Sequence, residues 1–257
     1  MPFITAPFTK RYLRIISTVP SQTELLYSLG LDKEVVGITK FCVHPHQWFT
    51  SKSRIGGTKN LNLKLIKELE PDLIIANKEE NIKEQIEKLA ETYDVYLSDI
   101  NTLEHATHMI LTIGSITGKV KTSQEISEKI KKEFYQLKYS GKKPMVVYLI
   151  WKDPYMAAGG DTFINDMIER CGFINSFKSK MRYPEVTIDE IKDSGCQLIL
   201  LSTEPYPFKE KHIEMLRKDL PDVKVILADG EFFSWYGSRL LLAPSYFIQL
   251  KDEYGIK

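Results

Sequence analysis

The chain has 257 residues, which is enough for one large domain or two modest ones. Apolar residues make up 43% and charged residues 27%, which is ordinary for folded globular domains and excludes wholesale disorder, a fibre and a membrane bundle. Lys and Arg number 35 against 34 Asp and Glu, so the net charge is +1. We therefore expect neither a nucleic-acid binder nor a polybasic membrane anchor.

Cys42, Cys171 and Cys196 stand at long, irregular spacing, which indicates buried thiols rather than a disulfide framework or a CxxC metal motif. Residues 1–16 hold no continuous apolar stretch of the length of a secretory signal, and no run of 18 apolar residues occurs. The residues alone thus favour a cytosolic location, although a chain from which a signal had been removed would look the same.

Short apolar strands alternate with helices along the first hundred residues. The order Ser21-Gln-Thr-Glu24 after Pro20 is a capping-box pattern and predicts the start of a helix that ends near Gly30. Strands are expected at 14–19, 35–38, 71–76 and 95–98, and further helices at 63–69 and 81–91.

The same alternation returns in the second half of the chain, including a second capping-box pattern at Thr187-Ile-Asp-Glu190. The strands that begin at 14, 72 and 95 have counterparts that begin at 145, 197 and 223, which are offsets of 131, 125 and 128 residues. Nearly constant offsets predict an α/β fold with two equivalent, Rossmann-like lobes and mainly parallel sheets. We expect an N-terminal lobe over 1–101 and a C-terminal lobe over 139–257.

The intervening segment, 102–138, has the apolar spacing of a helix. Apolar residues recur mostly three or four positions apart from Leu103 to Leu137, and no proline interrupts them. One long backbone helix joining the lobes is predicted, about 52 Å long at 1.5 Å per residue. Gly114 and Gly118 would leave a shallow groove on it or mark a bend.

Ligands of parallel α/β sheets bind at the carboxyl ends of the strands. In the second lobe the loops at these ends are rich in aromatic residues, above all Phe232-Phe-Ser-Trp-Tyr236, with four aromatic residues in five positions. We expect that they do not all face inward in a short loop, so this run favours a large flat or macrocyclic ligand over the alternative that it fills the core of the lobe.

Metal and catalytic patterns are weaker. His44 and His46 flank Pro45, and His105 and His108 lie one helical turn apart, which is a spacing that binds a metal only if a carboxylate joins it. Cys42 near His44, or Ser21 at a helix start, are candidate nucleophiles, but G-x-S-x-G, Walker A and G-x-G-x-x-G patterns are absent. No catalytic residue is assigned, and a binding protein is favoured over an enzyme.

Several segments together resemble a known family. They are Ile15-Ile-Ser-Thr-Val-Pro-Ser-Gln-Thr-Glu24, Ile55-Gly-Gly-Thr58 up to Asn62-Leu63, Leu69-Glu-Pro-Asp-Leu-Ile-Ile75 and Phe232-Phe-Ser-Trp-Tyr-Gly-Ser-Arg239. The chain resembles, over about residues 13–250, the periplasmic binding proteins with a helical backbone, and among them the cobalamin-binding receptors of ABC importers.

The resemblance implies a chelate, cobalamin-like or else a siderophore or haem complex, held in a cleft between the lobes by a monomeric receptor without a covalent cofactor. It places the protein in the periplasm, with the cytoplasm as the alternative because the sequence shows no signal. Position by position, the ligand-binding residues it implies are Phe41, His44, Asn77, Trp151, Tyr155, Phe233, Trp235 and Tyr236, with His44 as the candidate ligand of the chelate's metal.

Receptors of this kind present a glutamate on each lobe to arginines of the ABC permease. At the matching positions this chain has Lys64 and Asp189, and a lysine would repel an arginine; Glu68 or Glu190 would serve instead after a small shift of register. The alternative function is a cytosolic chelatase or corrinoid-modifying enzyme that uses His44, Glu204 or Cys42. A purely structural or partner-binding module is the third interpretation.

Overall fold

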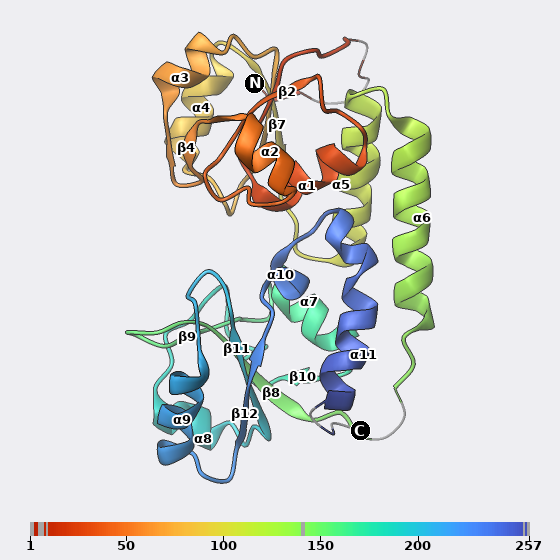
Figure 1. Cartoon of the computed structure of the whole chain (residues 1–257). Coiled ribbons are helices and arrows are strands. Elements are labelled where there is room, and N and C mark those ends of the chain that lie inside the picture. The colour runs from red at the N-terminus through yellow and green to blue at the C-terminus, as the bar shows by residue number, and fades with distance from the viewer. Residues whose placement is uncertain (1–2, 5–7, 9, 140–141, 254, 256–257) are drawn as a thin grey trace. The chain divides into compact units, whose positions relative to one another are not determined.

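The structure is a computed structural model that describes residues 3–4, 8, 10–139, 142–253 and 255 (Figure 1). Its contacts divide the chain into two compact units. Unit 1 comprises Met1–Ile100, Glu104–Lys131 and Tyr236–Arg239. Unit 2 comprises Asn101–Leu103, Lys132–Trp235 and Leu240–Lys257.

Unit 1 is built on a parallel sheet with the strand order β3-β2-β1-β6-β7, and a small antiparallel pair, β4-β5, lies outside it. All five residues of β6 are buried, as expected for a strand covered on both faces. The elements are β1 (Ile15–Ser17), α1 (Pro20–Ser28), β2 (Val35–Ile38), α2 (His46–Ser51), β3 (Ser53–Arg54), β4 (Gly56–Gly57), β5 (Asn60–Leu61), α3 (Leu63–Glu68), β6 (Leu73–Asn77), α4 (Lys83–Ala90), β7 (Asp94–Ser98), α5 (Leu103–Ile116), whose first residue belongs to unit 2, and α6 (Val120–Gln136), which belongs to unit 2 from Lys132 on.

Unit 2 repeats this plan with the parallel order β10-β8-β11-β12, and β9 pairs with β8 in the antiparallel sense. Its central strand β11 is also buried throughout. The elements are β8 (Met145–Trp151), β9 (Met156–Ala157), α7 (Phe163–Arg170), β10 (Ile174–Asn175), α8 (Ile188–Asp193), β11 (Leu198–Ser202), α9 (Glu210–Asp219), β12 (Lys224–Ala228), α10 (Glu231–Ser234), a 3₁₀ turn (Ser238–Leu241), whose first two residues belong to unit 1, and α11 (Ala243–Glu253). The predicted α/β fold with mainly parallel sheets is confirmed.

The prediction of one long helix over 103–137 is wrong, because two helices stand in its place. The chain leaves α5 after Ile116 and enters α6 at Val120, and Gly118 between them adopts a positive φ of 70°. The helices lie side by side (Figure 1), and a Cβ on Gly114 would come within 2.3 Å of the Ser123 Cβ. Gly114 therefore allows the two helices to approach closely, and Gly118 supplies the turn between them.

Of the two predicted capping boxes, one is present. Thr187 and Glu190 exchange side-chain to backbone hydrogen bonds at the start of α8, as expected. Helix α1 instead begins at Pro20, two residues earlier than the Ser21 pattern implies, with Val19 as its cap and no side-chain capping bond. Glu24 is consequently not a capping residue and forms an ion pair with Arg239.

Candidate functional site

In unit 1, the loop after β2 presents two of the predicted ligand residues. Phe41 is 51% exposed, and its ring lies over the backbone of Gly57 and 5.0 Å from the Lys40 ammonium. His44 follows on the same loop and is half-buried. An exposed ring that is held against the backbone beneath it is suited to contact an apolar ligand.

Asn77, at the carboxyl end of β6, has a structural role instead. Its side chain is 1% exposed; Oδ1 accepts hydrogen bonds from the Glu79 and Glu80 amides, and Nδ2 donates to Ser98. These bonds use both ends of the amide to shape the loop that joins β6 to α4. The expectation that Asn77 contacts the ligand is therefore corrected.

In unit 2, the end of β8 and the loop after β11 bring aromatic side chains together. Trp151 is 41% exposed and its ring packs edge-on against Tyr206, with 5.5 Å between ring centroids. Tyr155 and Tyr206 are partly buried against the core of the unit. Tyr206 was absent from the predicted ligand residues; its position directly after a strand of the second sheet was the signal for it.

The aromatic run that follows β12 is mostly buried: Phe233, Trp235 and Tyr236 are enclosed, and Phe232 is partly buried. Phe233 is fully buried between Tyr148 and Phe247, so it belongs to the core rather than to a ligand-binding loop. Phe232 stacks on Tyr246 with 4.4 Å between centroids. The short helix α10 turns these rings in different directions, and a turn of helix was not expected there.

Glu204 lies in the loop after β11 and connects that loop to the aromatic run after β12. Its Oε1 accepts hydrogen bonds from the Ser234 hydroxyl at 2.6 Å and the Trp235 indole N–H at 2.8 Å. Burial and the nearby carboxylate of Glu231 raise the pKa of Glu204, whereas the two hydrogen bonds oppose that shift. Glu204 thus fixes the Trp235 ring, which is 6% exposed.

The chain then passes from unit 2 to the segment Tyr236–Arg239 of unit 1. Tyr236 is 4% exposed. A Cβ on Gly237 would lie 2.5 Å from the Ser21 carbonyl oxygen, so only glycine fits here against α1. Arg239 makes a two-pronged ion pair with Glu24 at 2.7 and 3.0 Å. Most side chains of the run from Phe232 to Arg239 are therefore engaged in packing, hydrogen bonds or ion pairs of the fold itself.

Cys42 and the histidine pairs are the residues considered for catalysis and for metal binding. Cys42 is fully buried beside the hydroxyls of Thr23 and Thr39, and burial raises the pKa of its thiol, which opposes thiolate formation. Over the described part of the chain, no three His, Cys, Asp or Glu side chains lie close enough together to hold a metal ion. The His44–His46 and His105–His108 pairs therefore gain no further ligand there.

Two short helices occupy equivalent places in the two units. Helices α3 and α8 each have six residues, each follows a side-chain cap, and each leads into a central strand. Lys64 is the second residue of α3 and Asp189 the second of α8, and both are exposed. The two positions carry opposite charges.

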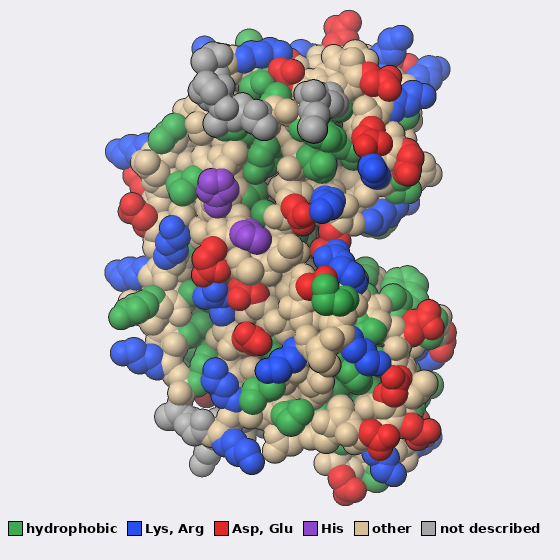
Figure 2. Space-filling view, turned by 180° about the vertical axis from the view of Figure 1, so that it is seen from behind, with side chains coloured by type: hydrophobic (Ala, Val, Ile, Leu, Met, Phe, Trp, Pro, Cys, Tyr) green, Lys and Arg blue, Asp and Glu red, His purple; other side chains and the backbone are tan. Residues whose placement is uncertain are grey.

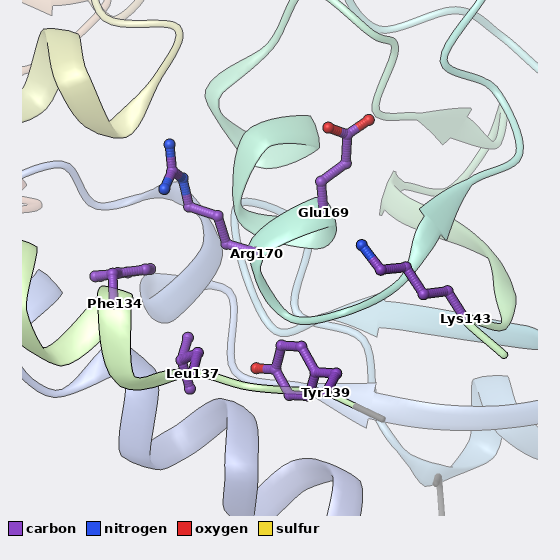
Figure 3. Close-up of a pocket in the computed structure, with 6 residues that line it drawn as sticks. All are labelled: Phe134, Leu137, Tyr139, Lys143, Glu169 and Arg170. Atoms are coloured by element: carbon purple, nitrogen blue, oxygen red, sulfur yellow. The ribbon is translucent and has the colours of Figure 1, made fainter. Parts of the chain in front are cut away.

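Unit 2 also has a cavity of about 290 Å³ (Figure 3). It is formed at the end of α6, at the end of α7 and before β8, which is the amino end of that strand. Figure 3 shows the side chains of Glu169 and Arg170 pointing in different directions. The lining residues are Phe134, Leu137, Tyr139, Lys143, Glu169 and Arg170.

Basic and acidic side chains are interspersed over the face shown in Figure 2. Among the described residues, no helix is both long and apolar enough to cross a membrane.

Both units are parallel α/β folds that expose aromatic side chains at the carboxyl ends of their strands, an arrangement that is suited to binding a solute. The chain belongs to the periplasmic binding protein family, whose model matches residues 15–222. The vitamin B12-binding protein of Vibrio cholerae serotype O1 is 25% identical over 194 residues, 74% of this chain and 70% of the relative.

Two solved structures have a similar fold. The periplasmic vitamin B12 binding protein BtuF of Vibrio cholerae matches with a TM-score of 0.80 at 20% identity, over 98% of this chain and 100% of that one. A possible iron-binding (periplasmic solute-binding) protein from Staphylococcus epidermidis matches with a TM-score of 0.78 at 24% identity, over 95% and 99%. The resemblance to binding proteins is confirmed, and nothing supports the alternative of a chelatase.

Proposed function

We propose that this protein is an extracytoplasmic receptor that binds cobalamin without chemical change and delivers it to an ABC permease. The observation that carries the proposal is the match over most of the chain to vitamin B12-binding proteins. A corrin ring is broad and has amide groups at its rim, so it is suited to aromatic side chains that offer apolar area and a polar edge.

Phe41 and Trp151 are the contacts that we assign first, because both rings are held in place yet keep about half of their surface exposed. Covering such a ring contributes about 1 kcal/mol, which corresponds to about fivefold in affinity. Tyr155 and Tyr206 extend the aromatic surface in unit 2. Trp235 and Tyr236 contribute less area because they are nearly buried.

His44 is proposed as the side chain that approaches cobalt. An imidazole nitrogen that replaced the water of aquocobalamin would shift the visible absorbance of the corrin. We expect this shift on binding to the wild-type chain and not to H44A, while both bind cyanocobalamin. The same spectrum in both chains would remove His44 from this role.

The binding test is isothermal titration of the purified chain with cyanocobalamin, with haemin and a ferric hydroxamate as competitors for the same role. One-to-one binding of cyanocobalamin is expected, weakened about fivefold in F41A and in W151A. Y135A is the matched control, because Tyr135 is an 82% exposed aromatic residue on helix α6 and not on a loop that follows a strand. The proposal fails if cyanocobalamin does not bind, or if only haemin or the hydroxamate does.

We propose α3 and α8 as the helices that dock to the permease. Their second residues, Lys64 and Asp189, differ in charge, so a permease with basic side chains at both places would be attracted by one and repelled by the other. In reconstituted transport, D189K should then slow uptake and K64E should speed it. Unchanged uptake in both variants would contradict this assignment.

A further inference from the structure

His212 is an almost buried histidine at the third position of α9, and it packs against the Tyr206 ring. It is 4% exposed, and its ring centroid lies 5.5 Å from that of Tyr206 and 5.4 Å from that of Phe208. Tyr206 in turn packs against the exposed Trp151. Trp151, Tyr155 and Tyr206 form the aromatic surface of unit 2, and His212 supports this surface without being part of it.

The hydrogen bonds of His212 define its protonation state. The Lys209 backbone N–H donates to Nδ1 at 2.8 Å, so Nδ1 carries no proton and the neutral ring keeps its proton on Nε2. Nε2 lies 3.4 Å from the Tyr206 hydroxyl, which is the acceptor in this tautomer. The neutral histidine therefore closes the first turn of α9 through Nδ1 and donates from Nε2 to Tyr206, and a proton on Nδ1 would break the first of these two bonds.

The surroundings disfavour a charged ring. Lys209 and Lys211 flank it on its own element, Lys152 approaches from the loop after β8, and the N-terminal end of the α9 dipole is positive. Lys152 is paired with Asp153 at 2.7 Å, and Tyr206 presents its hydroxyl. Desolvation, followed by the Lys211 and Lys152 charges, holds the pKa of His212 below its usual value.

We propose that His212 is a positioning residue for ligand binding, and that its protonation releases the Tyr206–Trp151 pair and weakens binding in acid. This inference rests on the proposed function. A proton on Nδ1 would face the Lys209 N–H, so the ring or the start of α9 must move, and Tyr206 loses its support.

The direction of the pH effect follows from the lowered pKa. The ring of His212 resists protonation while it keeps these contacts, whereas a ring released from them takes up a proton near pH 6.5. The arrangement with the neutral ring is therefore favoured above that pH, and its population falls as the pH falls below it.

The decisive variant is H212Q. A glutamine at the third position of a helix also accepts the N–H of the capping residue, yet it does not titrate. Cyanocobalamin titrations from pH 5.0 to 7.5 are expected to weaken about tenfold towards acid for the wild-type chain, and to change by less than about threefold for H212Q. H212A should bind more weakly throughout, and H108Q, at an exposed histidine of α5, should follow the wild type.

Equal pH profiles for wild type and H212Q would overturn the role of His212, as would an H212Q chain as weak as H212A at pH 7.5. No binding by the wild type at pH 7.5 would instead refute the proposed function. Tryptophan emission of the unliganded chain then tests His212 by itself. A step below pH 6.5 that is missing from both H212Q and W151F supports the coupling of His212 to Trp151, and a step that persists in H212Q contradicts it.

Discussion

Glu204 is a largely buried carboxylate on which two loops of unit 2 depend, and its replacement by alanine should destabilise that unit. The change removes the acceptor of the Trp235 indole N–H at 2.8 Å and of the Ser234 hydroxyl at 2.6 Å. The hydroxyl has a second acceptor in the Gly230 carbonyl at 2.9 Å, so the larger loss falls on Trp235.

A hydrogen bond to a charged group contributes about 1.5–3 kcal/mol, and relief from burying the charge offsets part of that. We therefore expect E204A to lower the free energy of unfolding by about 2 kcal/mol. E204Q keeps an oxygen at the same place and should cost about 1 kcal/mol at pH 7.

The pH dependence gives a second measure of the same contact. Because burial raises the pKa of Glu204, this group favours the folded state below the pKa of the unfolded chain and loses that contribution as the pH rises through the folded pKa. Glutamine has no such dependence, so the stability of E204Q relative to wild type should improve between pH 4.5 and 8.

Urea unfolding followed by fluorescence is the assay, since Trp235 is one of only three tryptophans in the chain. E214Q, at an exposed position of α9, is the control. A cost below about 0.5 kcal/mol for E204A, or a difference between E204Q and wild type that does not change with pH, would refute the reasoning.

Three further experiments test the fold. R239A should cost about 3 kcal/mol in urea unfolding, because it leaves the largely buried Glu24 carboxylate without this partner, and the E24Q/R239M pair should cost less than the two single changes together. G114A should lower the free energy of unfolding by about 2 kcal/mol. Adding S123A to G114A should not restore it, because the Cβ of residue 123 remains in contact with the new methyl group. Full stability of G114A would show that α5 and α6 move apart freely. Ellman's reagent should find no reactive thiol in the native chain and three after unfolding, and rapid native reaction would contradict the burial of the cysteines, which are Cys42, Cys171 and Cys196.

The run from Phe232 to Arg239 shows why a motif can identify a family and still mislead about a site. Its aromatic residues predicted a ligand surface, whereas Phe233 fills the core and Trp235 is held by Glu204. Gly237 and Arg239 attach the segment to α1. The sequence alone does not separate these roles, because it shows an aromatic residue in the same way whether the side chain packs into the core or faces the solvent.

The prediction of one long helix over the linking segment, residues 102–138, was wrong for a related reason. Apolar spacing from Leu103 to Leu137 is that of a helix throughout, and the pattern has the same period in one long helix as in two that pack together. Gly118 was recognised as a possible bend, but the close contact between Gly114 and Ser123 exists only once the chain has reversed direction.

The sequence by itself determined the alternation of strands and helices, the duplication and the family, because periodicity, caps and strand spacing are local and recur along the chain. The tertiary structure decided which side chains are exposed. Phe41 and Trp151 keep about half of their surface while Asn77 and Phe233 are enclosed, and Glu204 and His212 gain their roles only from partners outside their own strands and helices. Burial and pairing depend on neighbours that the linear order does not reveal, which is why the aromatic surface was foreseen in outline and its supports were not.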